Sequence, residues 1–227
     1  MQKIIVIEGT DGSSKQTQTS RLFERLKDRQ LNVKRLAFPN YDSLSSGPLK
    51  MYLGGELGDS PNSLNAYQAS TLFAVDRLIT MKQFENSNNQ DAILLLDRYV
   101  QSNIIHQACK IPDEKSRNEF VEWLYDFEFN VLNLPKPDLV YFLNMPPKYS
   151  LKLANNRQAL KFGTKKDIHE KDSDYQTKAY ETGLDMASKF GWQIINCVND
   201  KGEIKSIDEI NEEIINIFDQ IILNEVN

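Results

Sequence analysis

A short run near the N-terminus combines glycines, hydroxyl side chains and a lysine in an order that suits phosphate binding. Directly after an apolar segment the chain reads Glu8-Gly9-Thr10-Asp11-Gly12-Ser13-Ser14-Lys15-Gln16-Thr17. A strand, a glycine-bearing loop, a lysine and a helix together aim backbone N–H groups and a helix N-terminus at phosphate oxygens. This order predicts that residues 9–17 hold a nucleotide, with Lys15 neutralising its β and γ oxygens.

The run departs from the generic phosphate-loop pattern at two positions. Ser14 stands where a glycine precedes the lysine, and Gln16 stands where serine or threonine follows it. If the loop needs a positive φ at position 14, the Cβ of serine costs about 1 kcal/mol or more. Two interpretations remain open on these residues alone. The loop binds phosphate despite Ser14, or Gly9 and Gly12 only form a tight turn before a helix.

Further groups of polar and aromatic residues follow later in the chain. An arginine and an aspartate after an apolar run can bind an anion, but they can also form a buried ion pair that only fixes a loop. Likewise, Phe73 can serve as a platform for a base or as a core residue, and Phe38-Pro39 can simply end a strand. The groups are Phe38-Pro39-Asn40-Tyr41-Asp42-Ser43, Leu72-Phe73-Ala74-Val75-Asp76-Arg77 and Asp97-Arg98-Tyr99-Val100-Gln101-Ser102-Asn103.

Apolar runs separated by helical patterns must position these groups. Apolar runs without polar alternation are typical of parallel strands that helices cover on both faces. The sequence therefore predicts a doubly wound α/β fold, with a five-stranded parallel sheet flanked by helices in the manner of P-loop NTPases. The expected strands are Ile4–Ile7, Val33–Phe38 nearer an edge, Ala92–Leu96, Leu139–Leu143 and Trp192–Ile195.

Helical spacing of apolar residues marks the segments between the strands. Leu22 and Leu26 fit a first helix, and a short helix is expected within the Gly- and Ser-rich stretch 38–61. A packing helix is expected over residues 206–223, where isoleucines recur at helical intervals. A second long helix is indicated by Leu64, Leu72, Val75 and Ile79, and the short one by residues 49–53.

The stretch 157–174 carries many charges without apolar periodicity. Its composition alone favours a charged surface loop over a lid that covers phosphates. Its charged residues include Lys161, Lys165, Lys166, Asp167, His169, Glu170 and Asp174.

Composition bounds the class of protein. The chain has 227 residues, with 40% hydrophobic and 26% charged, which suits one globular domain over residues 1–227. The net charge of −5 disfavours a broad basic surface for nucleic acid or an anionic membrane. Cys109 and Cys197 have no metal-type spacing, so we expect buried thiols in a reducing compartment. Because no secretory leader and no run of roughly 18 apolar residues is seen, a cytoplasmic location is expected.

Taken together, the motifs resemble the thymidylate kinases, which are P-loop nucleoside monophosphate kinases. Asp97-Arg98-Tyr99, with Ser102, matches the family's D-R-Y-x-x-S, and Leu72 to Arg77 matches L-F-A-x-D-R. The segment that begins at Phe38 is similar to the one that touches the acceptor phosphate. Gln16-Thr17 falls within the variation of bacterial members, whose loop reads G-K-R-T. The match spans nearly the whole chain.

The resemblance implies a role for each group. Phe73 would stack on thymine, Arg77 would reach its O4, and Asn103 would donate a further hydrogen bond. Catalytic roles would fall to Lys15, Arg98, Asp11 and Arg157, and a Mg²⁺ ion to Asp11, Asp97 and Glu170. ATP binding would fall to Gly9, Thr10, Asp11, Gly12, Ser13, Ser14, Lys15, Gln16, Thr17 and Arg157, and dTMP binding to Phe38, Pro39, Tyr41, Phe73, Arg77, Asp97, Arg98, Asn103 and His106.

The resemblance also implies the reaction and its setting. The expected reaction moves the γ-phosphate of ATP to dTMP, with Mg²⁺ as cofactor and a lid at about residues 157–174 closing over ATP. A homodimer is expected through the helices after the second and third strands. Asn40 stands where the bacterial members carry arginine, and His106 replaces a tyrosine that lies beside the sugar. Choice among bases is therefore better supported than discrimination against ribose.

Two other functions stay open at this level. The first is a kinase of the same fold that acts on another nucleotide or nucleoside. The second is a non-catalytic nucleotide sensor or scaffold that kept the pocket after Ser14 impaired the loop. A GTPase switch is disfavoured because Asn199-Asp200-Lys201 has the wrong order for a guanine-binding N-K-x-D signature.

Overall fold

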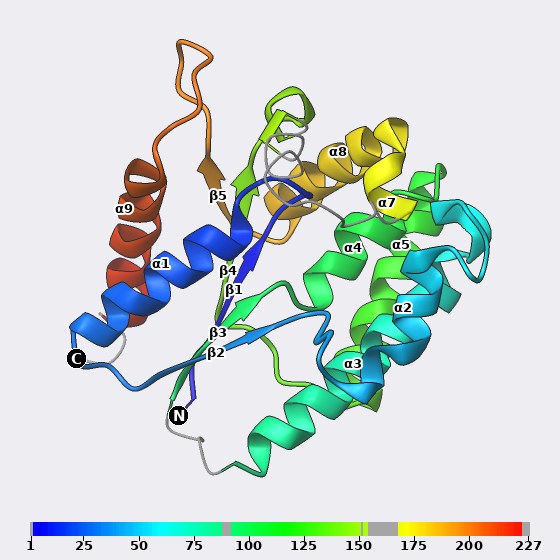
Figure 1. Cartoon of the computed structure of the whole chain (residues 1–227), viewed down its shortest axis with the longest axis horizontal. Coiled ribbons are helices and arrows are strands. Elements are labelled where there is room, and N and C mark those ends of the chain that lie inside the picture. The colour runs from blue at the N-terminus through cyan, green and yellow to red at the C-terminus, as the bar shows by residue number, and fades with distance from the viewer. Residues whose placement is uncertain (1, 88–91, 151, 154–167, 224–227) are drawn as a thin grey trace.

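A parallel sheet forms the centre of the chain. The computed structural model describes residues 2–87, 92–150, 152–153 and 168–223. The strands pair in the order β2-β3-β1-β4-β5, and all of these pairings are parallel. The predicted five-stranded sheet is confirmed, with β2 at an edge as expected (Figure 1). The strands are β1 (Ile4–Glu8), β2 (Val33–Ala37), β3 (Ile93–Asp97), β4 (Leu139–Asn144) and β5 (Gln193–Asn196).

Helices cover both faces of the sheet, which makes the fold doubly wound. In Figure 1, α1 and α9 lie on one side of the strands, and α3, α4, α5 and α8 lie on the other. The α-helices are α1 (Lys15–Asp28), α2 (Gly47–Gly54), α3 (Ala66–Glu85), α4 (Val100–Ala108), α5 (Glu114–Tyr125), α7 (Ile168–Lys171), α8 (Ser173–Lys189) and α9 (Ile207–Phe218). Shorter turns are the 3₁₀ segments η1 (Leu44–Ser46) and η2 (Pro61–Ser63) and the π-helical segments η3 (Asp126–Val131) and η4 (Asp219–Leu223).

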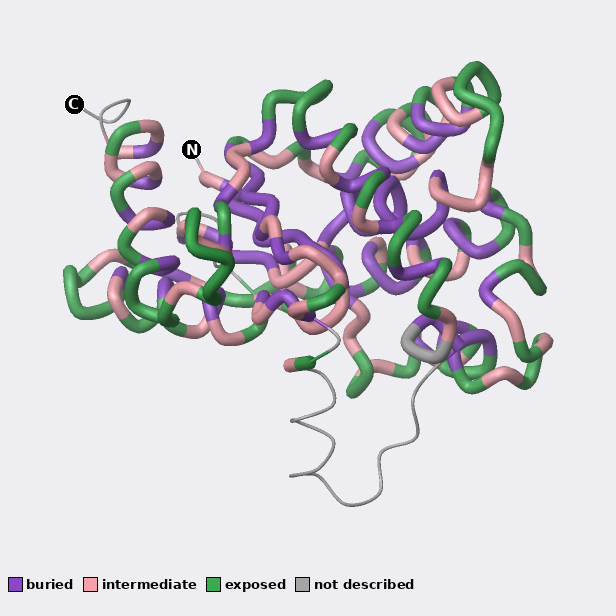
Figure 2. The backbone as a smooth tube through the Cα atoms, turned by 90° about the horizontal axis from the view of Figure 1, so that it is seen from above, coloured by how far each residue is buried: buried purple, intermediate pink, exposed green. Residues whose placement is uncertain are grey.

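The central strand β1 divides its side chains between the two faces. Ile5 and Ile7 pack with Leu22 of α1 and Ile214 of α9. Ile4 and Val6 belong to the cluster on the opposite face, with residues of α4, α5 and α8. Since every residue of β1 is buried, no polar face remains, which is why the sequence shows an unbroken apolar run. Figure 2 shows this burial as purple running through the strands.

Helix α3 leaves exposed two of the apolar residues whose spacing indicates it. Leu72, Val75 and Ile79 have helical spacing, but Val75 is 41% exposed and Ile79 is 38% exposed. The helix instead buries Asp76 and Arg77, which are 1% exposed. The predicted helix is confirmed, and two of the apolar residues that indicate it face outward. Polar groups that serve a cavity lie on the inner face.

Other expectations from the sequence meet the structure as follows. The short helix within 38–61 is α2, and the packing helix over 206–223 is α9 followed by η4. Cys197 is buried, whereas Cys109 is only partly buried, and both thiols are free. Within the described part of the chain, no helix combines the length and apolar character needed to cross a membrane.

Candidate active site

The predicted phosphate loop joins β1 to α1 at the carboxyl end of the sheet. Gly12 has φ +79°, and a Cβ there would lie 2.4 Å from the carbonyl oxygen of Ser150, so the loop needs glycine at this position. Ser14 is the N-cap of α1 and has φ 68° and ψ 22°. The loop thus adopts the left-handed conformation at position 14, which is the condition under which the Cβ of serine is unfavourable.

Lys15 begins α1 and turns back over the loop. It is 7% exposed, and its Nζ donates to the carbonyl oxygen of Thr10 at 2.6 Å and to Ser13 Oγ at 3.5 Å. Burial, together with the nearby charge of Arg98, lowers the pKa of Lys15 from 10.5 to about 8. The ammonium therefore lies inside the loop, where it can meet the phosphates of a bound nucleotide.

Arg98 follows β3 and reaches the same loop. Its Nη2 donates to Asp11 Oδ1, and Gln176 of α8 donates to the other oxygen of Asp11 at 3.1 Å. Burial raises the pKa of Asp11, but the positive charges, Arg98 first, outweigh it and hold that pKa well below its ordinary value. Arg98 has φ 68°, a left-handed conformation that is strained for an arginine and often occurs at functional sites.

A cavity of about 470 Å³ extends from the phosphate loop toward α3 and α4. Asp11 and Gln16 line its phosphate end, and Phe73 and Arg77 line it further along. Every residue that the sequence assigned to acceptor binding lies on its wall, namely Phe38, Pro39, Tyr41, Phe73, Arg77, Asp97, Arg98, Asn103 and His106. Residues from distant parts of the chain thus meet around one space.

Comparison with known proteins decides the family. A family model described as "Thymidylate kinase" matches residues 7–209. The chain belongs to the thymidylate kinase family.

Individual relatives agree with the family match. A thymidylate kinase of Mycobacterium tuberculosis is 30% identical over 190 residues, covering 83% of this chain and 87% of that protein. A thymidylate kinase of Plasmodium falciparum is 29% identical over 213 residues, covering 94% and 88%. The solved structure of a thymidylate kinase from Candida albicans superposes with a TM-score of 0.69 at 24% identity, covering 96% of this chain and 92% of that one.

Sequence reasoning missed Glu8, a buried acid at the end of β1. Its Oε1 accepts from the backbone N–H of Tyr99 at 2.8 Å, and its Oε2 accepts from Ser102 Oγ at 2.8 Å. Burial raises its pKa, although Arg98 and these hydrogen bonds act in the opposite direction. Glu8 therefore fixes the turn that carries Arg98. A charged residue ending an otherwise apolar strand was the available signal.

Sequence reasoning also missed Glu128, which lies behind the wall of the cavity that Arg77 and Asn103 form. Glu128 is fully buried and forms an ion pair with Arg77, with both hydrogen bonds at 2.6 Å. Asn103 Nδ2 donates to Glu128 Oε1 at 3.1 Å and to the carbonyl oxygen of Ser70 at 3.3 Å. The sequence predicts that Asn103 donates to the base, whereas in the structure its Nδ2 has two protein acceptors.

The loop after β2 is held by an aspartate of α3. Asp76 accepts from the backbone N–H of Asn40 at 2.8 Å and from Ser45 Oγ at 2.7 Å. Phe38 N–H donates to the carbonyl oxygen of Asp97 at 2.9 Å, which ties the end of β2 to the end of β3. These bonds fix the segment that carries Phe38, Pro39 and Tyr41 to the cavity.

Two histidines lie beside Arg98. His106 Nε2 is 3.1 Å from Arg98 Nη1, and since arginine can only donate, this nitrogen accepts. Burial and the charge of Arg98 hold the pKa of His106 well below its ordinary 6.5. His169 is 5% exposed and contacts Tyr52 and Tyr175. The reading of 157–174 as a charged surface loop is therefore wrong at His169, which lines the cavity.

Of the three proposed metal ligands, the structure describes the side chains of Asp11 and Asp97. Asp97 lines the cavity, and its carboxylate accepts no hydrogen bond from the described residues, so its oxygens suit Mg²⁺. Asp11 is engaged by Arg98 and Gln176. Among the described residues no cluster of three metal-binding side chains occurs. Arg157, the lid lysines and the side chain of Glu170 lie outside the described residues.

Proposed function

We propose that the chain is a thymidylate kinase that transfers the γ-phosphate of ATP to dTMP, giving dTDP and ADP for dTTP synthesis. The observation that carries the proposal is the continuous cavity, which has Asp11 and Gln16 of the phosphate loop at one end and Phe73, Arg77 and Asn103 further along. Arg98 lines the same cavity and reaches Asp11 of the loop. A donor and an acceptor that both carry phosphate would meet at Arg98.

Transfer needs alignment and charge neutralisation more than covalent help. An oxygen of the dTMP phosphate attacks the γ-phosphorus, and the bond from that phosphorus to the β–γ bridging oxygen breaks. No general base is required, because the attacking oxygen is already anionic. Lys15 and the loop N–H groups would hold the ATP phosphates, and the planar fork of Arg98 would span the acceptor phosphate and the moving group.

A Mg²⁺ ion would be held by Asp97 and Asp11, with Glu170 as a third proposed ligand. Magnesium keeps several waters and needs only one or two carboxylates near the phosphates, which suits the few acidic side chains here. When bound, the ion neutralises charge on the phosphoryl oxygens. The negative charge of Asp97 acts to raise the pKa of both Lys15 and Arg98, so Asp97 lies near the two cations, which supports this placement.

The base would lie at the α3 and α4 end of the cavity. Stacking on Phe73 is worth about 1–3 kcal/mol by analogy with base stacking elsewhere. Arg77 offers donors that suit the O4 of thymine, which the amino group of cytosine cannot satisfy. The thymine methyl contributes modestly, so dUMP should be a weaker acceptor and dCMP a poor one.

We further propose that residues 1–227 form one domain with a lid at about 157–174. Arg157 and the lysines of that stretch would add positive charge over ATP and exclude water that would hydrolyse it. His106, which stands where the family carries a tyrosine near the sugar, would line the sugar end of the acceptor site.

A homodimer through the helices after β2 and β3 belongs to the same proposal. Val75 and Ile79 lie one turn apart on α3 and are exposed, which supports an apolar contact surface on that helix. Sedimentation of the purified protein tests it, and a monomer at all concentrations would contradict it. The cytoplasmic location remains a prediction that cell fractionation can check.

Turnover tests the function directly. ADP production is measured with ATP and Mg²⁺ in the presence of dTMP, dUMP, dCMP, AMP, GMP or thymidine. Fastest turnover with dTMP is expected. A folded sample that binds nucleotide but turns over none of these acceptors would instead favour the non-catalytic sensor.

A further inference from the structure

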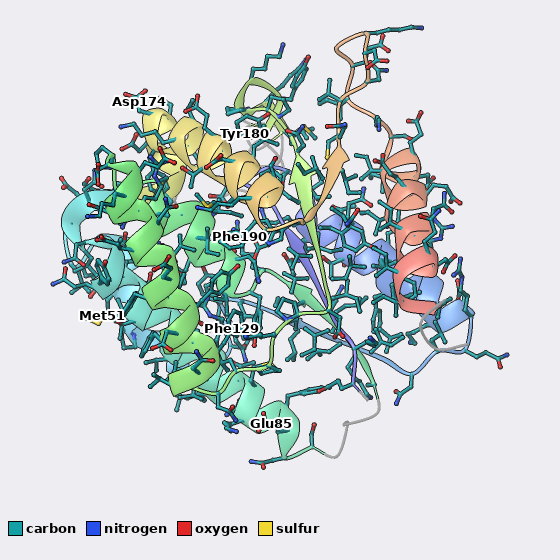
Figure 3. All side chains as sticks on the ribbon, turned by 180° about the vertical axis from the view of Figure 1, so that it is seen from behind. Met51, Glu85, Phe129, Asp174, Tyr180 and Phe190 are labelled. Carbon is teal, nitrogen blue, oxygen red and sulfur yellow. The ribbon has the colours of Figure 1, made fainter. Side chains whose placement is uncertain are left out.

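Glu128 comes from the π-helical segment η3, which directly follows α5. Its neighbour Phe129, labelled in Figure 3, packs on the rings of Tyr99 and Tyr125, with centroids 6.5 Å and 5.3 Å away. These contacts anchor η3 beneath the cavity. Glu128 itself is 0% exposed and is not part of the cavity wall, so it meets a ligand only through the residues that it holds.

Its carboxylate determines which donors of Arg77 remain. Oε2 accepts from Arg77 Nε and Oε1 accepts from Arg77 Nη2, both at 2.6 Å. Nη1 lies 3.4 Å from the carbonyl oxygen of Tyr99. A guanidinium has five N–H donors, so donors on the Nη atoms remain for a ligand, and Arg77 lines the cavity. Arg77 therefore offers only donors, from a plane that Glu128 fixes.

The same carboxylate orients the amide of Asn103. Its Nδ2 has two acceptors, Glu128 Oε1 at 3.1 Å and the Ser70 carbonyl oxygen at 3.3 Å. Turning the amide over would set its oxygen against both of these oxygens, so the orientation is determined by chemistry. Asn103 Oδ1 accepts no hydrogen bond from the described part of the chain, and Asn103 lines the cavity. The amide therefore offers an acceptor to a ligand.

We propose that Glu128 is a positioning residue that sets base preference by holding Asn103 as an acceptor beside Arg77 as a donor. The inference rests on the proposed function. Thymine and uracil present an N3–H donor next to the O4 acceptor, which matches this pair. Cytosine presents the opposite pattern, an N3 acceptor next to an amino donor, and would leave buried groups unpaired. Discrimination against cytosine thus depends on a carboxylate that does not touch the base.

Glu128→Gln tests the role because it keeps the size of the side chain but can present either oxygen or NH₂ to Asn103. The Asn103 amide can then turn over, so that Oδ1 and Nδ2 exchange places and Nδ2 donates to N3 of cytosine. We compare kcat/KM for dTMP, dCMP and dUMP. The dTMP to dCMP ratio should fall by about tenfold or more. The dTMP to dUMP ratio should stay within about twofold, because both bases present the same edge.

Glu122→Gln is the matched control, since Glu122 is exposed on the preceding helix α5. It should keep both ratios of the unaltered protein. An unchanged dTMP to dCMP ratio in active Glu128→Gln, or an equal loss of rate with all three acceptors, would overturn the proposal. If the unaltered protein does not turn over dTMP, the proposed function fails separately, and calorimetric binding of dTMP and dCMP to both proteins still tests Glu128.

Glu128→Gln removes the carboxylate that pairs with buried Arg77 and can therefore prevent folding. The unaltered protein provides a second test. The side-chain amide of Asn103 is observed by ¹⁵N NMR and assigned by its absence in Asn103→Ser. Its hydrogens should exchange slowly with solvent without nucleotide, and their resonances should move little when dTMP is added. Rapid exchange, or a large shift that shows Nδ2 bound to the base, would contradict the proposal.

Discussion

Arg98 and Asp11 form an ion pair at the phosphate end of the cavity, although they lie 87 positions apart in the chain. The pair joins the turn after β3 to the loop after β1, which are neighbouring strands. Arg98 is thereby held beside the phosphate loop before any nucleotide binds. Glu8 accepts a hydrogen bond from the backbone N–H of Tyr99, the residue after Arg98. When an anionic phosphate binds, Arg98 would release Asp11 and donate to the phosphate oxygens instead.

Replacing Arg98 tests the proposed bridge between donor and acceptor. Arg98→Ala should lower kcat with dTMP by about 10³-fold or more, because an arginine on a transferring phosphoryl group is worth that much in related chemistry. Arg98→Lys should recover only part of the rate, since a point charge cannot hold two phosphate oxygens in a plane. Steady-state kinetics measures both.

The control for Arg98 is Arg21→Ala, which removes an exposed arginine that pairs with Asp208 on the surface. Its kcat should match that of the unaltered protein. Near-normal turnover in a well-folded Arg98→Ala protein would refute the mechanism.

Ser14→Gly should stabilise the loop. Ser14 has φ 68°, and glycine adopts this region without the Cβ penalty of about 1 kcal/mol. We expect the free energy of unfolding to rise by up to about that amount and ATP affinity to hold or increase. Chemical denaturation and calorimetric ATP titration measure these. A large loss of ATP affinity would show instead that the loop depends on the serine.

The lowered pKa of Lys15 predicts how ATP binding depends on pH. In the free protein Lys15 loses its proton near pH 8, more than two units below its ordinary value of 10.5. Phosphates favour the charged form, so the Kd for ATP should be flat below about pH 8 and rise about tenfold per unit above it. Calorimetry between pH 7 and 9.5 measures this.

Lys15→Arg provides the comparison, because arginine stays charged over the whole range. Its ATP affinity should be weaker than that of the unaltered protein at pH 7 but independent of pH. Equal pH dependence in the two proteins would show that another group titrates.

His169 predicts a loss of stability in mild acid. Burial lowers its pKa from 6.5 to about 3, so between these values the unfolded chain takes up a proton that the folded protein refuses. The free energy of unfolding should therefore fall by about 1.4 kcal/mol per pH unit below 6.5 on account of this residue. His169→Gln should flatten the profile between pH 6 and 4, as measured by urea denaturation. An unchanged slope would contradict burial of a neutral His169.

The sequence determined the sheet and most of the cavity wall for local reasons. Short unbroken apolar runs between helical patterns are typical of buried parallel strands, and Lys15 follows a glycine-bearing loop at the end of the first of them. Phe38, Phe73 and Arg98 were identified because short motifs carry them. Their meeting follows from the parallel sheet, which brings the carboxyl ends of β1, β2 and β3 to one edge.

The tertiary structure decided what no local pattern contains. Glu128 lies 51 positions from Arg77 and 25 from Asn103, and no motif in the sequence connects it to either residue. Helix α3 buries Asp76 and Arg77, which line the cavity, and leaves Val75 and Ile79 exposed, which its apolar spacing does not show. Both depend on packing between distant segments, since a buried charge is tolerated only where the fold supplies its partner.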